Sequence, residues 1–566
     1  MTASEREDAM IKRRKDGWLL VSFLLLATFI IFLVIPLMRL LVQSVYSEDG
    51  KFTWENFHRF FTYTKGYYLK PIWNSVKVTV STTLVSLLLG IPIAYFYSFY
   101  KIRGAKVLFV VSVLCSMSAP FIGAYSWILL MGRNGVITKF LTGVLGVTVG
   151  NIYGFKGILL VQSLKFFPLV FIYMNGAFKN IDNTLLEASA NMGCTGIRRL
   201  FKVVLALSMP TILAASLMVF MQAFADFGTP MVMGEGYQTF PVMIYNAYLG
   251  EGGADRNFAA ALAVVAVVIT AIIFFFQKWG TSKFKFSMNA LHPVEKKKAK
   301  GLSGILMHLY CYILVAVAFM PQLYIIYLSF CEYKGSIRQR NPDGSQIYSL
   351  ANYAQAAKKL MGRSIKNTAV MGILALIIII IVAVLIAYLV VRRSSALNNT
   401  IDTISMLPYI MPGSVVGLGL LLAFGAKPIA LTGTFAIMVI SFVIRRLPYT
   451  IRSATATLMQ ISLSIEEAAI SLGASKLKTF IQITVPMMAN GILSGAILSW
   501  VAIVTEMSSS IILYSNKSIT LTMSTYLAIL RGNDGIAAAF ATILTVVTIA
   551  SLLLYLGISK SEDVKL

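Results

Sequence analysis

The chain has 566 residues, of which 57% are hydrophobic and only 13% are charged. A water-soluble domain cannot bury that much apolar surface, so the composition excludes a soluble protein and places the chain in a membrane. A net charge of +26 would suit a nucleic-acid partner only if the basic residues gathered on a soluble domain. The basic residues are instead spread between apolar runs. This distribution is typical of charges that orient membrane spans and contact lipid headgroups, so no nucleic-acid partner is expected.

The first apolar run, from Trp18 to Val42, follows the basic residues Lys12 to Lys15. It is too long for the core of a signal peptide and has no small-residue cleavage site. We therefore expect an uncleaved first span with a cytoplasmic N-terminus. Each of the runs that follow is long enough to cross the hydrocarbon core as a helix, and none alternates as a barrel strand does. These runs lie near residues 73–98, 107–131, 154–176, 208–228 and 257–277.

A polar stretch that contains HPVEKKKAKG then interrupts the apolar pattern, as a cytoplasmic linker does. Six more apolar runs follow it. They lie near residues 303–330, 366–391, 400–424, 433–450, 489–513 and 535–557. The predicted fold is an all-α polytopic membrane protein of about twelve spans, with both termini in the cytoplasm. We expect a first six-span unit at residues 1–280, a linker at 281–302 and a second six-span unit at 303–566.

The two units have the pattern of copies of one another. The offset in numbering from Glu187 to Glu467 is the same as the offset from Gly193 to Gly473. A fixed register of this kind indicates an internal repeat, and we call this constant difference the repeat offset. Because each copy has an even number of spans, the repeats are expected to be parallel and related by an axis along the membrane normal.

Four cysteines and three histidines are scattered along the chain without the spacing of a disulfide framework or a zinc site. No disulfide framework and no metal site is therefore expected. The chain also lacks the G-x-x-x-x-G-K-[ST] pattern of a phosphate-binding loop, so it cannot bind ATP in that way.

A long cytoplasmic stretch lies between the fourth and fifth spans of each copy. The first, from Leu185, reads LLEASANMGCTGIRRLFKVVLALSMP, and the second, from Ile465, reads IEEAAISLGASKLKTFIQITVPMM. In both, a Gly lies six residues after a Glu, and a basic segment with apolar residues at intervals of three and four follows. The pattern predicts a helix, a turn that needs glycine, and a second helix.

These stretches resemble the EAA loop of the permeases of binding-protein-dependent ABC importers. The second copy matches the pattern at Glu467, Ala468 and Gly473, and the first at Glu187, Ala188 and Gly193. The first copy departs from the pattern at two positions, with Ser189 at the second alanine and Ala206 where the motif has proline. The second departure leaves the exit angle of that helix open.

The resemblance implies the fold of a type I ABC importer permease in a bacterial cytoplasmic membrane. Each loop would dock in a groove on an ATPase subunit, so two ATPase copies are expected. ATP and magnesium would bind to these partners, and this chain would have no cofactor and no enzymatic activity. Its external segments are too short to hold a solute-binding domain, so a separate binding protein is expected outside.

The stretch from Phe224 to Tyr248, GRNGVITKFL from Gly132, and the segment that begins at Glu506 resemble fused permeases of ferric-iron-type importers. Ferric iron is therefore the first expectation for the substrate. Phosphonate, hexose phosphate, another small anion, polyamine and thiamine remain as alternatives. A secondary transporter driven by an ion gradient, an exporter permease and a structural scaffold are the rival classes. The paired EAA loops argue against the secondary transporter.

Charged residues recur inside the expected spans. Lys165 and Arg445 are related by the repeat offset, and Asp226 and Glu506 each follow their basic counterpart at the same spacing. Intramembrane charges are costly and usually face a cavity or a partner. We hypothesise two polar clusters, Lys165 with Asp226 and Arg445 with Glu506, that line or gate the pore. The alternative is that both basic residues snorkel to the interface, and Arg446 is expected to be more peripheral.

Overall fold

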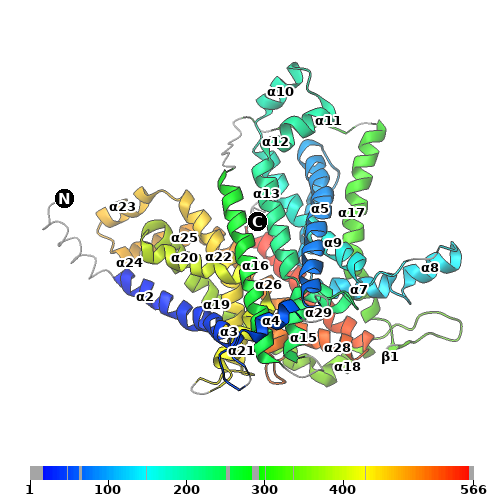
Figure 1. The fold of residues 1–566 in the computed structure, drawn as a ribbon. Coiled ribbons are helices and arrows are strands. Elements are labelled where there is room, and N and C mark those ends of the chain that lie inside the picture. Colours follow the sequence, from blue (N-terminus) through cyan, green and yellow to red (C-terminus); the bar gives the residue numbers. More distant parts are fainter. Residues whose placement is uncertain are drawn as a thin grey trace. The chain divides into compact units, whose positions relative to one another are not determined.

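The computed structural model describes residues 17–47, 49–62, 67–147, 150–249, 255–283, 292, 294–299, 301–335, 337–426 and 429–559. The basic residues before the first span, the residues after 559 and residues 284–291, 293 and 300 of the expected linker lie outside the described residues. Figure 1 shows the fold along the chain.

The chain packs into two compact units, and each combines segments from both halves of the sequence. Unit 1 comprises residues 1–53, 360–523 and 547–566, and unit 2 comprises residues 54–359 and 524–546. The helix expected as the first span therefore belongs to a unit built mainly from the second half of the chain. This packing division differs from the division into sequence repeats at 1–280 and 303–566, which stays a prediction.

Where the structure describes it, unit 2 is helical apart from one short hairpin. Its elements are α4 (Glu55–Thr62), α5 (Leu69–Phe99), α6 (Ala105–Met117), α7 (Pro120–Met131), α8 (Val136–Val144), α9 (Phe155–Lys179), α10 (Asn183–Asn191), α11 (Gly196–Arg199), η3 (Leu200–Val204), α12 (Leu205–Leu207), α13 (Met209–Ala225), α14 (Gly228–Met233), α15 (Phe240–Leu249), α16 (Arg256–Lys283), α17 (Gly301–Ser329), β1 (Tyr333–Lys334), β2 (Ile337–Arg338) and α18 (Ala351–Ala356). The two strands pair antiparallel, and η4 (Ala357–Met361) leads from this unit into the next.

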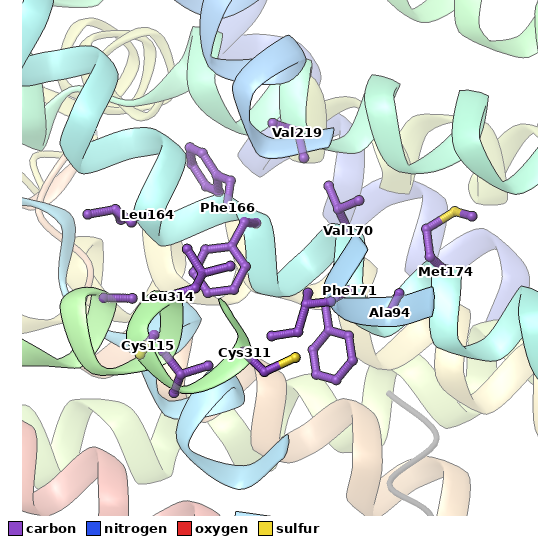
Figure 2. Packing of buried hydrophobic residues seen from close by; sticks show 14 of the residues in the cluster. Ala94, Cys115, Leu164, Phe166, Val170, Phe171, Met174, Val219, Cys311 and Leu314 are labelled. Carbon is purple, nitrogen blue, oxygen red and sulfur yellow. The ribbon is translucent and has the colours of Figure 1, made fainter. Parts of the chain in front are cut away.

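The core of unit 2 forms around α9. Figure 2 shows α9 side chains packed among residues of α5, α6, α13 and α17; the labelled residues are Ala94, Cys115, Leu164, Phe166, Val170, Phe171, Met174, Val219, Cys311 and Leu314. Helices α5 and α9 come especially close because Gly90 has no side chain: a Cβ there would lie 2.6 Å from the Cβ of Val170. Small residues allow this close approach between helices in a membrane, where packing drives association.

Unit 1 consists of helices and π-helical turns. Its elements are α2 (Gly17–Phe29), η1 (Ile30–Val34), α3 (Ile35–Ser44), α19 (Gly362–Arg392), α20 (Ala396–Ile410), α21 (Gly413–Phe424), α22 (Phe435–Gln460), α23 (Leu463–Ser471), α24 (Lys476–Thr479), η5 (Phe480–Thr484), α25 (Val485–Met487), α26 (Ala489–Val504) and α27 (Ser510–Leu513). Helix α28 (Leu521–Leu530) runs from unit 1 into unit 2, and α29 (Asp534–Ser559) runs from unit 2 into unit 1.

Within unit 1, α22 packs on α19, α20 and α26, while α2 and α3 pack on α20 and α21. Gly495 lets α26 approach α22, since a Cβ there would lie 2.6 Å from the Cα of Thr450. Ser22 on α2 donates a hydrogen bond of 2.8 Å to Asn398 on α20. A buried hydrogen bond between spans adds to the packing that holds the first helix in this unit.

The all-helical membrane fold expected from the sequence is confirmed. Among the described residues, seven helices are long and apolar enough to cross a membrane, and four bent helix pairs raise the number to eleven if each pair is one span. Helix α22 matches the remaining expected span near 433–450. It is 26 residues long and carries Arg445, Arg446 and Arg452, which lower its hydropathy.

The two sequence halves repeat the same elements. Helices α5 and α19 both have 31 residues, and α10 and α23 both have 9 residues. The first residues of α10 and α23, Asn183 and Leu463, are related by the repeat offset. The short elements that follow α10, namely α11, η3 and α12, recur as α24, η5 and α25. The internal repeat therefore extends from residue identities to the positions of helix starts and ends.

Candidate functional site

The two expected coupling loops have the predicted helix–turn–helix form. Helices α10 and α23 begin at side-chain caps: Asp182 accepts a hydrogen bond of 2.9 Å from the backbone N–H of Thr184, and Ser462 accepts one of 3.3 Å from that of Ser464. Such caps satisfy backbone donors that have no partner inside the helix. In Figure 1, α10 and α11 lie beside α12, which leads into α13.

Each turn depends on the glycine that the motif contains. Gly193 has a φ of +78° and Gly473 a φ of +92°, a left-handed conformation that other residues adopt at a cost. The N–H of the next residue bonds back to the helix, from Cys194 to the carbonyl of Ser189 at 2.8 Å and from Ala474 to that of Ala469 at 3.1 Å. These bonds close the ends of α10 and α23 with a left-handed cap.

The chain bends sharply where each loop enters the next span. The angle is 74° between Gly196–Leu207 and Met209–Ala225, and 68° between Lys476–Met487 and Ala489–Val504. The two angles are similar although the first copy has Ala206 in place of the motif proline, Pro486. The departure from the motif therefore leaves the exit angle nearly unchanged.

The predicted coupling residues lie on the surface of their loops. Glu187, Ala188 and Gly193 are exposed in the first copy, and Glu467, Ala468 and Gly473 are exposed in the second. Glu187 also accepts a hydrogen bond of 2.6 Å from the side chain of Asn183. The next motif position faces inward, since Ser189 is 3% exposed and Ala469 is 8% exposed.

Exposed apolar side chains beside these residues were not singled out by the sequence reasoning. Met192 is 81% exposed and its counterpart Leu472 is 89% exposed. Two further pairs related by the repeat offset complete what we call the apolar triads, which are Met192, Ile197 and Phe201 in the first copy and Leu472, Leu477 and Ile481 in the second. The repeat offset is the signal that could have found them, because an apolar residue recurs at each of these positions in both copies.

Helix α23, the expected second coupling helix, is anchored by a buried ion pair that the sequence reasoning also missed. Arg392, the last residue of α19, donates from Nε to Oε1 of Glu466 at 2.8 Å and from Nη2 to the carbonyl of Ile461 at 2.7 Å. The hydroxyl of Tyr388 lies 3.4 Å from the other carboxylate oxygen of Glu466. Only 10% of the Arg392 side chain and 6% of the Glu466 side chain are exposed.

The first coupling helix is anchored differently. Phe99 ends α5 where Arg392 ends α19, the helix of the same length, and Leu186 replaces Glu466 at the repeat offset. Phe99 and Leu186 both lie in the apolar core of unit 2. The linker residue His292 adds main-chain contacts: its N–H donates to Asp182 at 3.2 Å, and its carbonyl accepts from the N–H of Asn183 at 3.0 Å. The two copies thus hold equivalent helices by different means.

The predicted pair of Arg445 and Glu506 lies together in unit 1. Both arginines at this position, Arg445 and Arg446, donate to Glu506, one to each carboxylate oxygen. The side chain of Glu506 is 1% exposed, that of Arg445 8% and that of Arg446 16%. The expectation that Arg446 is peripheral is therefore wrong, because the carboxylate has two oxygens and α22 places both guanidinium groups against it. Ser509 adds a backbone hydrogen bond of 3.1 Å to the same carboxylate.

The corresponding group in unit 2 is built differently. Asp226 is buried and accepts hydrogen bonds from the side chain of Gln162 at 3.0 Å and from the backbone N–H of Gly228 at 3.1 Å. Lys165 lies one turn from Gln162 on α9, with its Nζ 5.2 Å from the centre of the Phe166 ring. Lys165 also lines a small cavity together with Trp127 and other residues of α6, α7, α9 and α17. Among the described residues, no group of three His, Cys, Asp or Glu could hold a metal ion.

Comparison with known proteins decides the family. The model of the binding-protein-dependent transport system inner membrane component matches residues 78–285 and again residues 379–560. The chain belongs to this family. It carries the family's permease domain twice, and both coupling loops, α10–α12 and α23–α25, lie within the matched ranges.

Two relatives match most of the chain, and a third matches about one third of it. The chain is 29% identical to a ferric transport system permease protein of Actinobacillus pleuropneumoniae over 95% of this chain and 77% of that protein. It is 28% identical to a putative ferric transport system permease protein of Haemophilus influenzae over 88% of this chain and 78% of the relative. A molybdenum transport permease of the same organism is 30% identical over 36% of this chain and 90% of its own length. The protein is thus the permease of an ABC importer and contains two fused copies of the family's domain.

Proposed function

We propose that this permease imports ferric iron, powered by two ATPase subunits that dock on its two coupling loops. The observation that supports docking is the pair of apolar triads, which leave large apolar side chains exposed at equivalent positions of both copies. An exposed apolar patch with a polar rim is typical of a surface that another protein covers. The exposed Glu187 and Glu467 beside them supply polar contacts at the edge of each patch.

The choice of ferric iron is supported by the names of the two relatives that span most of the chain, both ferric transport permeases. A separate solute-binding protein would deliver the iron from outside, as the family's description implies. Since the coupling loops would face the cytoplasm, and four spans precede the first of them, the N-terminus would be cytoplasmic too. The ATP and magnesium would remain on the partner subunits.

Co-purification with the ATPase subunit tests the docking directly. Met192→Asp and Leu472→Asp each place a charge in one docking surface, while Met192→Leu keeps an apolar side chain there as the control. Burial of one such side chain contributes on the order of 2 kcal/mol, so each Asp variant should weaken its own docking site by at least tenfold. We expect two ATPase subunits per wild-type chain, one in each single variant and none in the double variant. Full binding to the double variant would contradict the proposal.

Uptake into proteoliposomes tests the substrate. The wild-type chain, its ATPase and the external binding protein should accumulate ferric iron when ATP is supplied, and should not accumulate molybdate or a phosphonate. Accumulation without ATP in a proton or sodium gradient would favour the secondary-transporter alternative instead.

A further inference from the structure

The arginine cluster in unit 1 contains more positive charge than its single carboxylate balances. Arg445 and Arg446 both pair with Glu506, and among the described residues Glu506 is the only carboxylate that forms an ion pair with either arginine. The three side chains are largely buried, so the cluster holds a net charge of about +1 away from bulk water. A buried charge without a partner costs several kcal/mol, which favours binding of an opposite charge.

Both guanidinium groups retain hydrogen-bonding capacity. The Nε atoms of Arg445 and Arg446 are buried and have no hydrogen-bond partner in the structure. Arg445 is more than nine-tenths buried, so this N–H faces protein and not solvent. A guanidinium group offers two N–H donors to a planar or tetrahedral oxyanion, and this geometry is well suited to carboxylate and phosphate oxygens.

The surroundings of the cluster add positive potential. Helix α21 begins at Gly413, which lies so close to Arg445 that a Cβ there would be 2.6 Å from Nη1. The first backbone N–H groups of a helix have no acceptor within it, and they favour anions. The hydroxyl of Ser414, the second residue of α21, is also buried without a partner. Tyr449, one turn from Arg446 on α22, is a polar neighbour of its guanidinium group.

The first copy lacks this excess of positive charge. Phe166 takes the place of Arg446 there, and Gln162, an uncharged residue, donates to Asp226. Its formal charges, Lys165 and Asp226, sum to zero. The excess positive charge is therefore a feature of the second copy alone and not a requirement of the repeated fold.

We propose that Arg445 and Arg446 form a binding site for an oxyanion, a carboxylate or phosphate group, within the transport pathway. This inference rests on the proposed function for the identity of the cargo. A bare trivalent cation would be repelled by the cluster, whereas iron that keeps carboxylate or phosphate ligands brings the oxygens that the arginines bind. The cargo would then cross as an iron–oxyanion complex, or a free oxyanion would neutralise the cluster first.

Equilibrium binding of radiolabelled citrate and of inorganic phosphate to the full chain in lipid nanodiscs tests the site. Arg446→Phe installs the residue of the first copy, Arg446→Lys keeps the charge, and Phe166→Leu is a control in the first copy. We expect one saturable site per wild-type chain, at least tenfold weaker binding by Arg446→Phe, a smaller loss by Arg446→Lys because lysine keeps the charge but lacks the Nε–H donor, and binding within about threefold of wild type by Phe166→Leu. Retained co-purification with the ATPase shows that Arg446→Phe is folded.

Two arms of the binding experiment, one with and one without stoichiometric ferric iron, distinguish the source of the oxyanion. Binding of citrate or phosphate alone assigns the site to a free oxyanion, and binding only together with iron assigns it to the cargo complex. Either result supports the site. Equal binding by wild type and Arg446→Phe, or no saturable binding in either arm, overturns it. If oxyanion binding is present but ferric iron is not transported, the proposed cargo fails and the site stands.

Discussion

The ion pair between Arg392 and Glu466 offers a direct test of how the second coupling helix is held. Replacing Glu466 by Leu removes a charge-assisted hydrogen bond of 2.8 Å and the contact with Tyr388, while Arg392 keeps its bond of 2.7 Å to the carbonyl of Ile461. Removing one partner of a fully buried pair costs about 3–5 kcal/mol. Because Arg392 retains one acceptor and is 10% exposed, we expect a smaller loss of about 2–3 kcal/mol.

That loss should appear as local opening of α23. A change of about 2–3 kcal/mol corresponds to roughly 30- to 150-fold less protection of its backbone amides from hydrogen exchange. The amides of α10 are the internal control, because their anchors contain neither residue. The double variant Arg392→Phe with Glu466→Leu reproduces the apolar pair of the first copy, Phe99 and Leu186, and should restore protection to within about threefold of wild type.

Hydrogen exchange followed by mass spectrometry of the full chain in lipid nanodiscs measures both effects. If Glu466→Leu leaves α23 as protected as wild type, the ion pair does not anchor the helix. If the double variant is no better protected than the single one, the two copies do not use interchangeable anchors.

Three further changes test other parts of the structure. Gly473→Val forces a β-branched residue into a left-handed conformation at a cost of about 1–3 kcal/mol and should uncouple ATP hydrolysis from uptake; normal coupling in proteoliposomes would contradict the role of the turn. Asp182→Ala removes both the cap of α10 and the hydrogen bond from the His292 N–H, one of the two main-chain contacts between this linker residue and the start of α10, so limited proteolysis should cut the linker faster, whereas Ser462→Ala removes only a cap and should not change that rate. Gly413→Ala places a Cβ 2.4 Å from that of Ser508 and should lower the Tm through overpacking, while Gly123→Ala, whose nearest neighbour is 3.8 Å away, should leave the Tm nearly unchanged.

Structural features that depend on a local sequence pattern could be predicted from the sequence. Apolar runs predicted the spans because each span meets lipid along its own length, and the spacing from Glu467 to Gly473 predicted a helix followed by a left-handed turn. The repeat offset predicted that Arg445 and Glu506 would meet, because coincident charges in two copies indicate one shared position in the fold.

Contacts that differ between the copies could not be predicted in the same way. Arg446 and Glu466 have apolar counterparts, Phe166 and Leu186, so the repeat offered no second instance to support a charged role. Gln162 donates to Asp226 from a distant part of the chain, and nothing in its local sequence marks it as a partner. The sequence also could not predict that the first helix packs with the second half of the chain. Apolar periodicity indicates that one face of a helix is buried, but it does not indicate which other helix buries that face.

The interleaving of the two halves has a consequence for biosynthesis. Helices α2 and α3 pack on α20 and α21, yet more than half of the chain separates Ser44, where α3 ends, from Ala396, where α20 begins. At a translation rate of about 5–20 residues per second, the first helix waits roughly 20–70 seconds for these neighbours to be made. During that interval its lipid-facing and protein-facing sides are both exposed to the bilayer, so a chaperone or insertase that shields early membrane helices has a defined period in which to act on this chain.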